Sequence, residues 1–287
     1  MPTKHNFEQV KITTSLEVTG PIQGVTVIET SRVGASQTFT NGTVTTAIGD
    51  AVNVNNSSCA SVMGYQATAI CSNQSVVLGR SAASCCNSNA VIIGANAKVV
   101  NNADCAISMG LNACVSCSTD GIAIGRSAVV KYNGQNSNNG IAIGNCACVD
   151  KGIDSIVMGR QAIAKDGSDS AVVLGVSARA KCSFSGAVAI GRGALACCSS
   201  APVVIGCNAI ACNANYGIAI GRNASATGEE ATQLGNGTNS AACTLQFRGY
   251  QLLDAGGCIP VDRLSGINFN GAVTNLTVCC GIVTAAS

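Results

Sequence analysis

The chain of 287 residues is poor in charged and aromatic side chains. Only 10% of its residues are charged, 3% are aromatic and none is Trp. The charged fraction is less than half that of an average globular domain. A net charge of +2 provides neither the basic field that nucleic-acid binding requires nor an acidic tail. We therefore expect no nucleic-acid partner, and a core filled by small aliphatic residues.

Histidine is almost absent as well. The single one, His5, lies in a polar leader, so no Ser-His-Asp or Cys-His arrangement can form in the remainder of the chain. Cys114 and Cys117 form a lone CxxC motif, and Cys146 and Cys148 a lone CxC motif. Neither has the second pair that a zinc site at finger spacing requires. We expect no enzymatic activity, no cofactor and no metal site.

Long apolar runs are also missing. No run approaches the ~20 residues that a membrane helix requires, so we expect no membrane insertion. Residues 1–10 (MPTKHNFEQV) lack the apolar stretch of a secretory signal.

A short sequence motif, repeated thirteen times, occupies most of the chain. Clear copies are GIAIGRSAVV from Gly121, AVAIGRGALA from Ala187 and GIAIGRNASA from Gly217. One glycine in each copy, such as Gly125 in the first of these, marks the repeat. These thirteen glycines are spaced by 14 to 19 residues, mostly 15 or 16, and Ile, Leu or Met precedes every one of them. They are Gly49, Gly64, Gly79, Gly94, Gly110, Gly125, Gly144, Gly159, Gly175, Gly191, Gly206, Gly221 and Gly235.

A period of about 15 residues is too short for a pair of helices and suits one coil of a β-solenoid. Apolar residues alternate on both sides of the glycine, which indicates two short strands joined at a glycine corner. The residues one and three before each glycine should share a face, and those three and five after it should point inward. Thirteen rungs at ~4.8 Å each predict a rod of roughly 60 Å.

The position two before each glycine faces the other way and should be polar if it met water. It is apolar in eleven of thirteen copies, so we expect this strand to be buried on both faces. Coils of such small residues cannot cover the second face themselves, which predicts that other chains cover it. The candidates for this oligomer core are Val62, Val77, Ile92, Val157, Val173 and Val204.

The units SVVLGRSA (75–82), GIAIGRSA (121–128) and AVAIGRGA (187–194) resemble the head repeats of trimeric autotransporter adhesins, the YadA-like left-handed parallel β-roll. The resemblance covers about 190 of the 287 residues. It implies a homotrimer whose glycine-containing strands surround a common axis. It is less specific for function, because one fold supports many functions. The coiled-coil stalk and membrane anchor of that family are not recognisable here.

The flanking segments differ from the repeat, and we divide the chain into residues 1–40, a β-roll of residues 41–240, and residues 241–287. The segment SLEVTGPIQG (15–24) resembles N-terminal segments of phage and viral fibre proteins, which attach to the particle. The segment YQLLDAGGCIPVDRL (250–264) resembles sequences that follow repeats in fibre proteins of phages and large DNA viruses. We expect the last segment to be a β-rich cap and trimerisation element, because a solenoid end exposes unpaired strand edges.

The 18 cysteines allow two interpretations. Five of them, at the seventh position after a glycine, would continue the inward alternation as small apolar fillers. These are Cys71, Cys86, Cys117, Cys182 and Cys198. Alternatively, pairs in adjacent coils could form disulfides if their geometry permits. The pairs are Cys71 with Cys86, Cys182 with Cys198, and Cys197 with Cys212.

Possible surface contacts also have two interpretations. Arginine follows the glycine at position 80 and then, in every second coil, at Arg126, Arg160, Arg192 and Arg222. Alternate spacing avoids repulsion on an exposed corner, but the column could also bind sulfated or sialylated glycans. Tyr132 lies in a polar insertion, KYNGQNSNN (131–139), which is either a solvated bulge or a receptor-contact loop.

Together these features predict an all-β, homotrimeric fibre or spike on the exterior of a virus particle, such as a phage tail fibre. It would contact other virion proteins through its N-terminal segment and attach to a host receptor or glycan. The alternative is the head of a cellular trimeric adhesin at the cell surface.

Two other classes of β-solenoid fit the sequence poorly. Hexapeptide acyltransferases need about eighteen residues per coil and a catalytic His, and ice-binding solenoids need Thr-x-Thr ladders in register.

Overall fold

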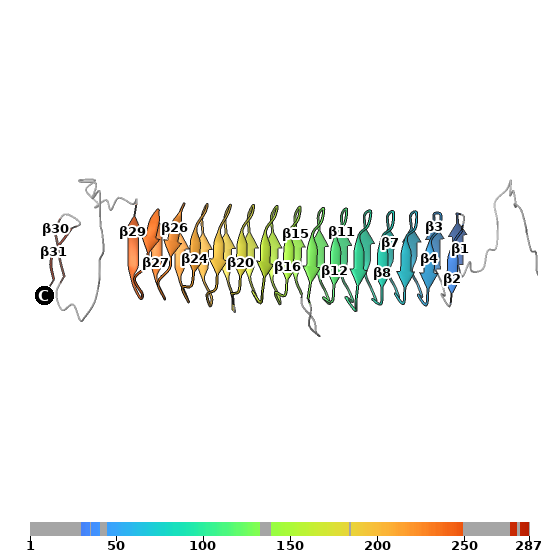
Figure 1. Cartoon of the computed structure of the whole chain (residues 1–287), viewed down its shortest axis with the longest axis horizontal. Helices are drawn as coiled ribbons and strands as arrows, with labels where there is room; N and C mark the ends of the chain where they lie inside the picture. Colours follow the sequence, from blue (N-terminus) through green and yellow to red (C-terminus); the bar gives the residue numbers. More distant parts are fainter. Residues whose placement is uncertain are drawn as a thin grey trace, which may run out of the picture.

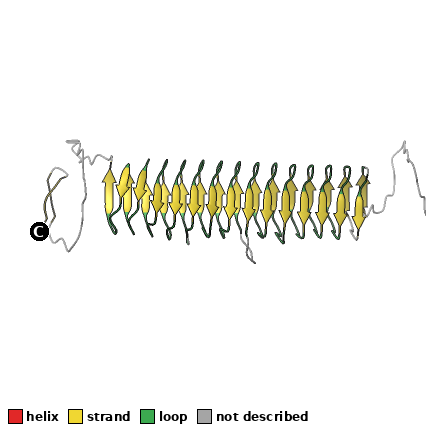
Figure 2. Cartoon of the chain, in the orientation of Figure 1, coloured by secondary structure: helices red, strands yellow, loops and turns green. Residues whose placement is uncertain are grey.

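The computed structural model describes residues 30–34, 36–40, 45–132, 139–183, 185–248, 276–279 and 282–286. Every regular element in these residues is a β-strand. Strands pair in parallel with the second strand before and the second strand after them, which creates two long sheets. Figures 1 and 2 show the resulting stack of two-stranded coils. The predicted all-β solenoid, with a repeat of about 15 residues, is confirmed.

Sheet A has fifteen strands and contains the residues that precede each glycine. Its strands are β1 (Thr30–Val33), β3 (Thr45–Ile48), β5 (Ser61–Met63), β7 (Val76–Leu78), β9 (Val91–Ile93), β11 (Ile107–Met109), β13 (Ile122–Ile124), β15 (Ile141–Ile143), β17 (Ile156–Met158), β19 (Val172–Leu174), β21 (Val188–Ile190), β23 (Val203–Ile205), β25 (Ile218–Ile220), β27 (Thr232–Gly235) and β29 (Leu245–Arg248).

Sheet B has fourteen strands and contains the residues that follow each glycine. Its strands are β2 (Thr38–Thr40), β4 (Asn53–Asn55), β6 (Thr68–Ile70), β8 (Ala83–Cys85), β10 (Lys98–Val100), β12 (Cys114–Ser116), β14 (Val129–Lys131), β16 (Cys148–Asp150), β18 (Ile163–Lys165), β20 (Arg179–Lys181), β22 (Leu195–Cys197), β24 (Ile210–Cys212), β26 (Ala224–Ala226) and β28 (Gly237–Asn239). A separate antiparallel pair is formed by β30 (Leu276–Cys279) and β31 (Ile282–Ala286).

The solenoid extends beyond the predicted limits of residues 41–240. At the N-terminal end, β1 pairs with β3 and β2 pairs with β4, so one coil precedes the thirteen repeats. Gly34 marks its corner, with a φ of 130°. At the other end, β29 pairs with β27. Residues 1–29, residues 133–138 of the insertion and the segment 250–264 lie outside the described residues, so attachment and capping by these segments stay predictions.

The glycine that marks each repeat is required for two reasons. Its own backbone has a positive φ, and the neighbouring coil leaves no space for a side chain. From Gly49 to Gly221 the φ angles of these glycines lie between 128° and 143°, a region that L-residues rarely adopt. A Cβ atom on Gly125 would also overlap the carbonyl group of Gly144 in the next coil. The same overlap recurs from coil to coil along the glycine column, because successive corners stack directly on one another.

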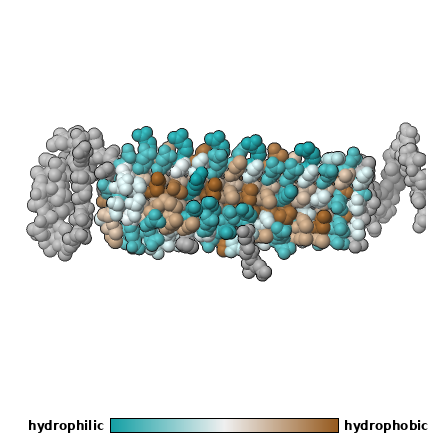
Figure 3. Space-filling model, in the orientation of Figure 1, coloured by the Kyte–Doolittle hydropathy of each residue, from teal (hydrophilic) through white to brown (hydrophobic). Residues whose placement is uncertain are grey.

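Each coil also turns at corners where polar residues adopt left-handed backbone. In the coil of Gly159 these residues are Asp154, Gln161 and Asp166, with φ angles of 52°, 59° and 57°. Such residues tolerate this conformation better than aliphatic residues do. Figure 3 shows hydrophilic residues gathered along the upper edge of the rod, above a face of mixed hydropathy.

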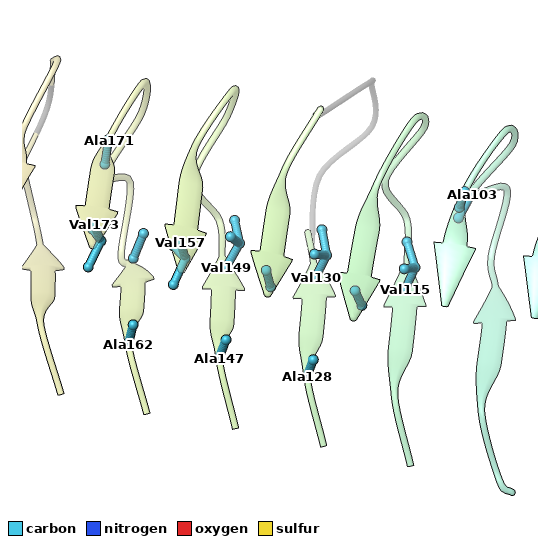
Figure 4. Close-up of a cluster of buried hydrophobic side chains, with 14 of the residues drawn as sticks. Ala103, Val115, Ala128, Val130, Ala147, Val149, Val157, Ala162, Ala171 and Val173 are labelled. Atoms are coloured by element: carbon cyan, nitrogen blue, oxygen red, sulfur yellow. The ribbon is translucent and has the colours of Figure 1, made fainter. Parts of the chain in front are cut away.

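The core is a single layer of small side chains between the two sheets. Sheet A contributes the residues two and four before each glycine, and sheet B those three and five after it. In one coil these are Ser155, Val157, Ala162 and Ala164, and the structure buries all four completely. Figure 4 shows the same arrangement in neighbouring coils, with Val and Ala side chains between the strands. No aromatic residue is among the buried hydrophobic residues of the described chain.

Buried serines connect successive coils where sheet B ends. The Ser57 hydroxyl donates to the carbonyl of Asn55 (3.0 Å) and accepts the backbone N–H of Ser72 in the next coil (2.9 Å). Ser199 does the same, with bonds of 2.8 Å to Cys197 and 3.0 Å from Ala214. The hydroxyl therefore satisfies a backbone N–H that the strand ladder does not reach.

We predict that Gly125→Ala destabilises the solenoid more than Gly167→Ala does. Both glycines have positive φ, but a Cβ on Gly167 would have nothing within 4 Å. The Gly167 variant should lose about 1–2 kcal/mol, the cost of left-handed backbone for an L-residue. The Gly125 variant should lose at least about twice as much, because the next coil must also move. Denaturant unfolding measures both, and equal losses would contradict the close stacking of the corners.

Candidate functional site

The outer face of sheet A is aliphatic along ten consecutive strands, from β7 to β25. The first and third residues of every one of these strands are Val, Ile, Leu or Met. These side chains point away from the coil interior and are partly exposed, with 37% exposure at Ile156 and 43% at Met158. We call this surface, the outer residues of β7–β25, the aliphatic strip.

The aliphatic strip is long and narrow. At ~4.8 Å between paired strands, ten strands give a length of about 45 Å and a width of two side chains. Soluble monomers rarely expose a contiguous apolar patch larger than a few hundred Å², and larger patches usually mark interaction sites. The strip is therefore the strongest candidate for an interaction surface in the described part of the chain.

The predicted oligomer-core residues do not belong to this strip. All six have 0% exposure and lie inside the coil, so they cannot contact another chain: Val62, Val77, Ile92, Val157, Val173 and Val204. The prediction that these positions face a partner is wrong. The residues on either side of them in each strand face outward instead, so sheet A does present an apolar outer face, but through the other set of side chains.

The reason for this error is that both alternating sets are apolar, so hydrophobicity does not distinguish them. Side-chain size does. The inward set in the three-residue strands of sheet A is mainly Ala and Val, whereas the outward set includes all the Ile, Leu and Met residues except Ile92. Ala and Val fill most of the narrow space between the two sheets, so size was the available signal.

The four predicted contact arginines form one exposed column at the corner that follows sheet A. Arg126, Arg160, Arg192 and Arg222 are all exposed. Backbone hydrogen bonds connect this corner in register from coil to coil, for example from Ser177 N–H to the Arg160 carbonyl (2.9 Å). Side chains in every second coil are about 10 Å apart, near the Debye length at physiological salt, which limits their repulsion.

Tyr132 is not brought to the arginine column. It follows β14 in sheet B, whereas Arg126 follows β13 in sheet A, and its side chain is half-buried. The predicted turn glycines do lie together, in the single stacked column described above: Gly64, Gly79, Gly94, Gly125, Gly191 and Gly221.

The outer face of sheet B differs from the aliphatic strip, because charged and polar residues interrupt it. Lys98 and Arg179 are exposed on this face. In adjacent strands, Lys131 forms an ion pair with Asp150 at 3.2 Å. Exposed pairs of this kind contribute little to stability, but they show that the outer face of sheet B is not a continuous apolar surface.

The cysteines at the seventh position after a glycine are not core fillers, so that prediction is wrong. Cys71, Cys86 and Cys198 are exposed, and Cys117 and Cys182 are half-buried. All five have left-handed backbone, with φ between 49° and 57°. This corner interrupts the alternation, and the next residue, usually a buried serine, occupies the inward position instead.

One predicted inter-coil pair is bonded. Cys197 and Cys212 are paired in register between β22 and β24 and form a disulfide with a Cα–Cα distance of 4.5 Å.

The CxxC motif is split between the outer face of β12 (Cys114) and the following corner (Cys117). Burial raises the pKa of the Cys114 thiol. No group of three or more His, Cys, Asp or Glu side chains in the described residues could hold a metal ion.

Comparison with models of known protein families finds no match, and no curated protein sequence matches the chain. Among the described residues, no helix has the length and apolar character needed to cross a membrane.

We predict that Val173→Leu and Val172→Leu have different effects, although they are adjacent residues of β19 and gain the same methylene group. Val173 is fully buried in the coil, so the larger side chain should cost about 1–3 kcal/mol through overpacking. Val172 faces outward and is partly exposed in one chain, so its variant should cost less than the Val173 variant, because no opposite sheet confines the added methylene group. Denaturant unfolding compares them, and the reverse order would contradict the observed orientation of sheet A.

Proposed function

We propose that the chain forms a homotrimeric, left-handed β-roll fibre or spike on the exterior of a virus particle, where it attaches the particle to a host surface. The observation that supports this proposal is the aliphatic strip. A rod with one apolar face along its length is suited to pack lengthwise against copies of itself.

The chemistry of the strip favours identical partners. Its side chains are purely aliphatic or thioether, with no charged or hydrogen-bonding group to recognise a polar ligand. Burial of such area is favourable in proportion to the area removed from water. Copies arranged around an axis parallel to the rod would bring the same coil of each chain to the same height, so the strips would match along their whole length. The resemblance of the repeats to trimeric adhesin heads favours three copies.

In this arrangement the remaining surfaces have separate roles. Sheet B and the arginine corner would face outward and be available to a receptor or an anionic glycan. The N-terminal segment would contact other virion proteins, and residues 241–287 would cap and trimerise the fibre.

Antibodies against the solenoid would test the location. In particles purified from a culture that produces the chain, they should label projections on the particle surface in electron micrographs. Label confined to the cell envelope would instead support the head of a cellular trimeric adhesin. Absence of label from both surfaces would contradict the proposal.

We predict that assembly protects the methionines of sheet A from oxidation. Three of the four methionines, Met63, Met109 and Met158, occupy the outward position before a glycine. Met63 and Met158 are 40% and 43% exposed in one chain, so peroxide should oxidise them readily unless other chains cover them.

Mass spectrometry after brief peroxide treatment measures the sulfoxide at each position. The matched control is an Ile156→Lys variant, whose charge within the strip should prevent packing between chains. The native protein should oxidise much more slowly than this variant at Met158. Equal rates, with both proteins folded, would contradict coverage of the strip.

A further inference from the structure

Four cysteines gather where three successive coils meet at the end of sheet B. Cys197 and Cys212 are already joined between β22 and β24. Cys198 follows Cys197 directly, and Cys182 lies in the preceding coil. Two thiols thus lie beside an existing inter-coil disulfide.

Cys182 and Cys198 occupy equivalent corners of successive coils. Each follows the last residue of its strand, β20 or β22, and each has a φ of 50°. The Cys182 N–H donates to the Lys165 carbonyl (3.2 Å), and the Cys198 N–H donates to the Lys181 carbonyl (2.9 Å). Residues stacked in this way are ~4.8 Å apart, which falls within the Cα–Cα range of disulfides.

The two thiols also influence each other. Partial desolvation raises the pKa of the Cys182 thiol, and the charge and hydrogen bond of Cys198 raise it further.

The same corner carries a second pair in an earlier part of the rod. The Cys71 N–H donates to the Asn55 carbonyl (2.8 Å), and the Cys86 N–H donates to the Ile70 carbonyl (2.9 Å). Their φ angles are 49° and 57°. The Cys86 thiol lies 3.6 Å from the thiol of the adjacent Cys85. Cys85 raises the pKa of Cys86, whereas Cys71 lowers it.

We propose that Cys182–Cys198 and Cys71–Cys86 are oxidation sites that form inter-coil disulfides by exchange with a small-molecule disulfide. The first bridge and Cys197–Cys212 together link three successive coils through the adjacent residues Cys197 and Cys198. Coils of a solenoid contact only their neighbours, so the bridges clamp the rod against local separation of its coils.

The exchange is balanced with oxidised glutathione as the oxidant. The Cys182 thiolate attacks one sulfur of oxidised glutathione, forming a mixed disulfide and releasing one glutathione thiolate. The Cys198 thiolate then attacks the Cys182 sulfur and releases the second glutathione. Two cysteine thiols lose two protons and two electrons, and one oxidised glutathione becomes two reduced molecules. Each bridge forms within one chain, so the proposal holds whether or not the chains trimerise.

Peptide mapping tests the proposal directly. The purified full-length chain is incubated with oxidised glutathione, free thiols are alkylated, and the protein is digested with trypsin without reduction. Cleavage after Lys181, Arg192 and Arg222 places Cys182 alone in residues 182–192, and Cys197, Cys198, Cys207 and Cys212 in residues 193–222. We expect these two peptides to be recovered as a linked species from the folded protein.

Two variants identify the bond. Cys198→Ser should abolish the link to residues 182–192, whereas Cys117→Ser should leave it unchanged. Cys117 has the same corner geometry, with a φ of 53°, but no cysteine follows it at the equivalent corner, where Tyr132 stands. For the second pair, Cys86→Ser should abolish the link between residues 33–80 and 81–98. Full alkylation of Cys182 in the folded protein, or a link that persists in the Cys198→Ser variant, would overturn the proposal.

Discussion

The interior of each coil is so narrow that only one layer of small side chains fits between the two sheets. This constraint explains the abundance of Ala and Val at the inward positions and the lack of buried aromatic residues in the described chain. It also limits how much apolar surface one coil can bury by itself. The larger aliphatic residues, such as Ile156 and Met158, are consequently on the outside of sheet A, where one chain leaves them partly exposed.

Stacking of identical corners makes the coils into a rod. The glycine column permits the closest approach of backbone, while buried hydroxyls such as that of Ser199 bridge corners that strand pairing does not reach. Parallel pairing continues in register through both sheets, so a residue type repeated in the sequence becomes a column in space. The aliphatic strip, the arginine column and the cysteine pairs all arise because equivalent residues of successive repeats stack on one another.

Much of this architecture could be predicted from the sequence, because a period of about 15 residues and a glycine in each copy leave few alternatives. The two strands per coil and the stacked glycines were predictable for that reason, whereas the Cys197–Cys212 bridge was only one of the pairings that the sequence left open. The orientation of sheet A was not, because both faces are apolar and only the small size of residues such as Val173 indicates the inward set. The prediction that the corner cysteines point inward was wrong because left-handed backbone at Cys71 and its equivalents interrupts a simple alternation of side chains. The coil of Gly34 was missed because its strands contain Thr, Ser and Arg in place of the aliphatic pattern.

We propose that other copies of the chain cover the outer face of sheet A. The mass of the native particle, measured by sedimentation or native mass spectrometry at micromolar concentration, tests it most directly. We expect a particle of three chains that persists on dilution, since the strip runs along ten strands. A folded, soluble single chain at that concentration would contradict it.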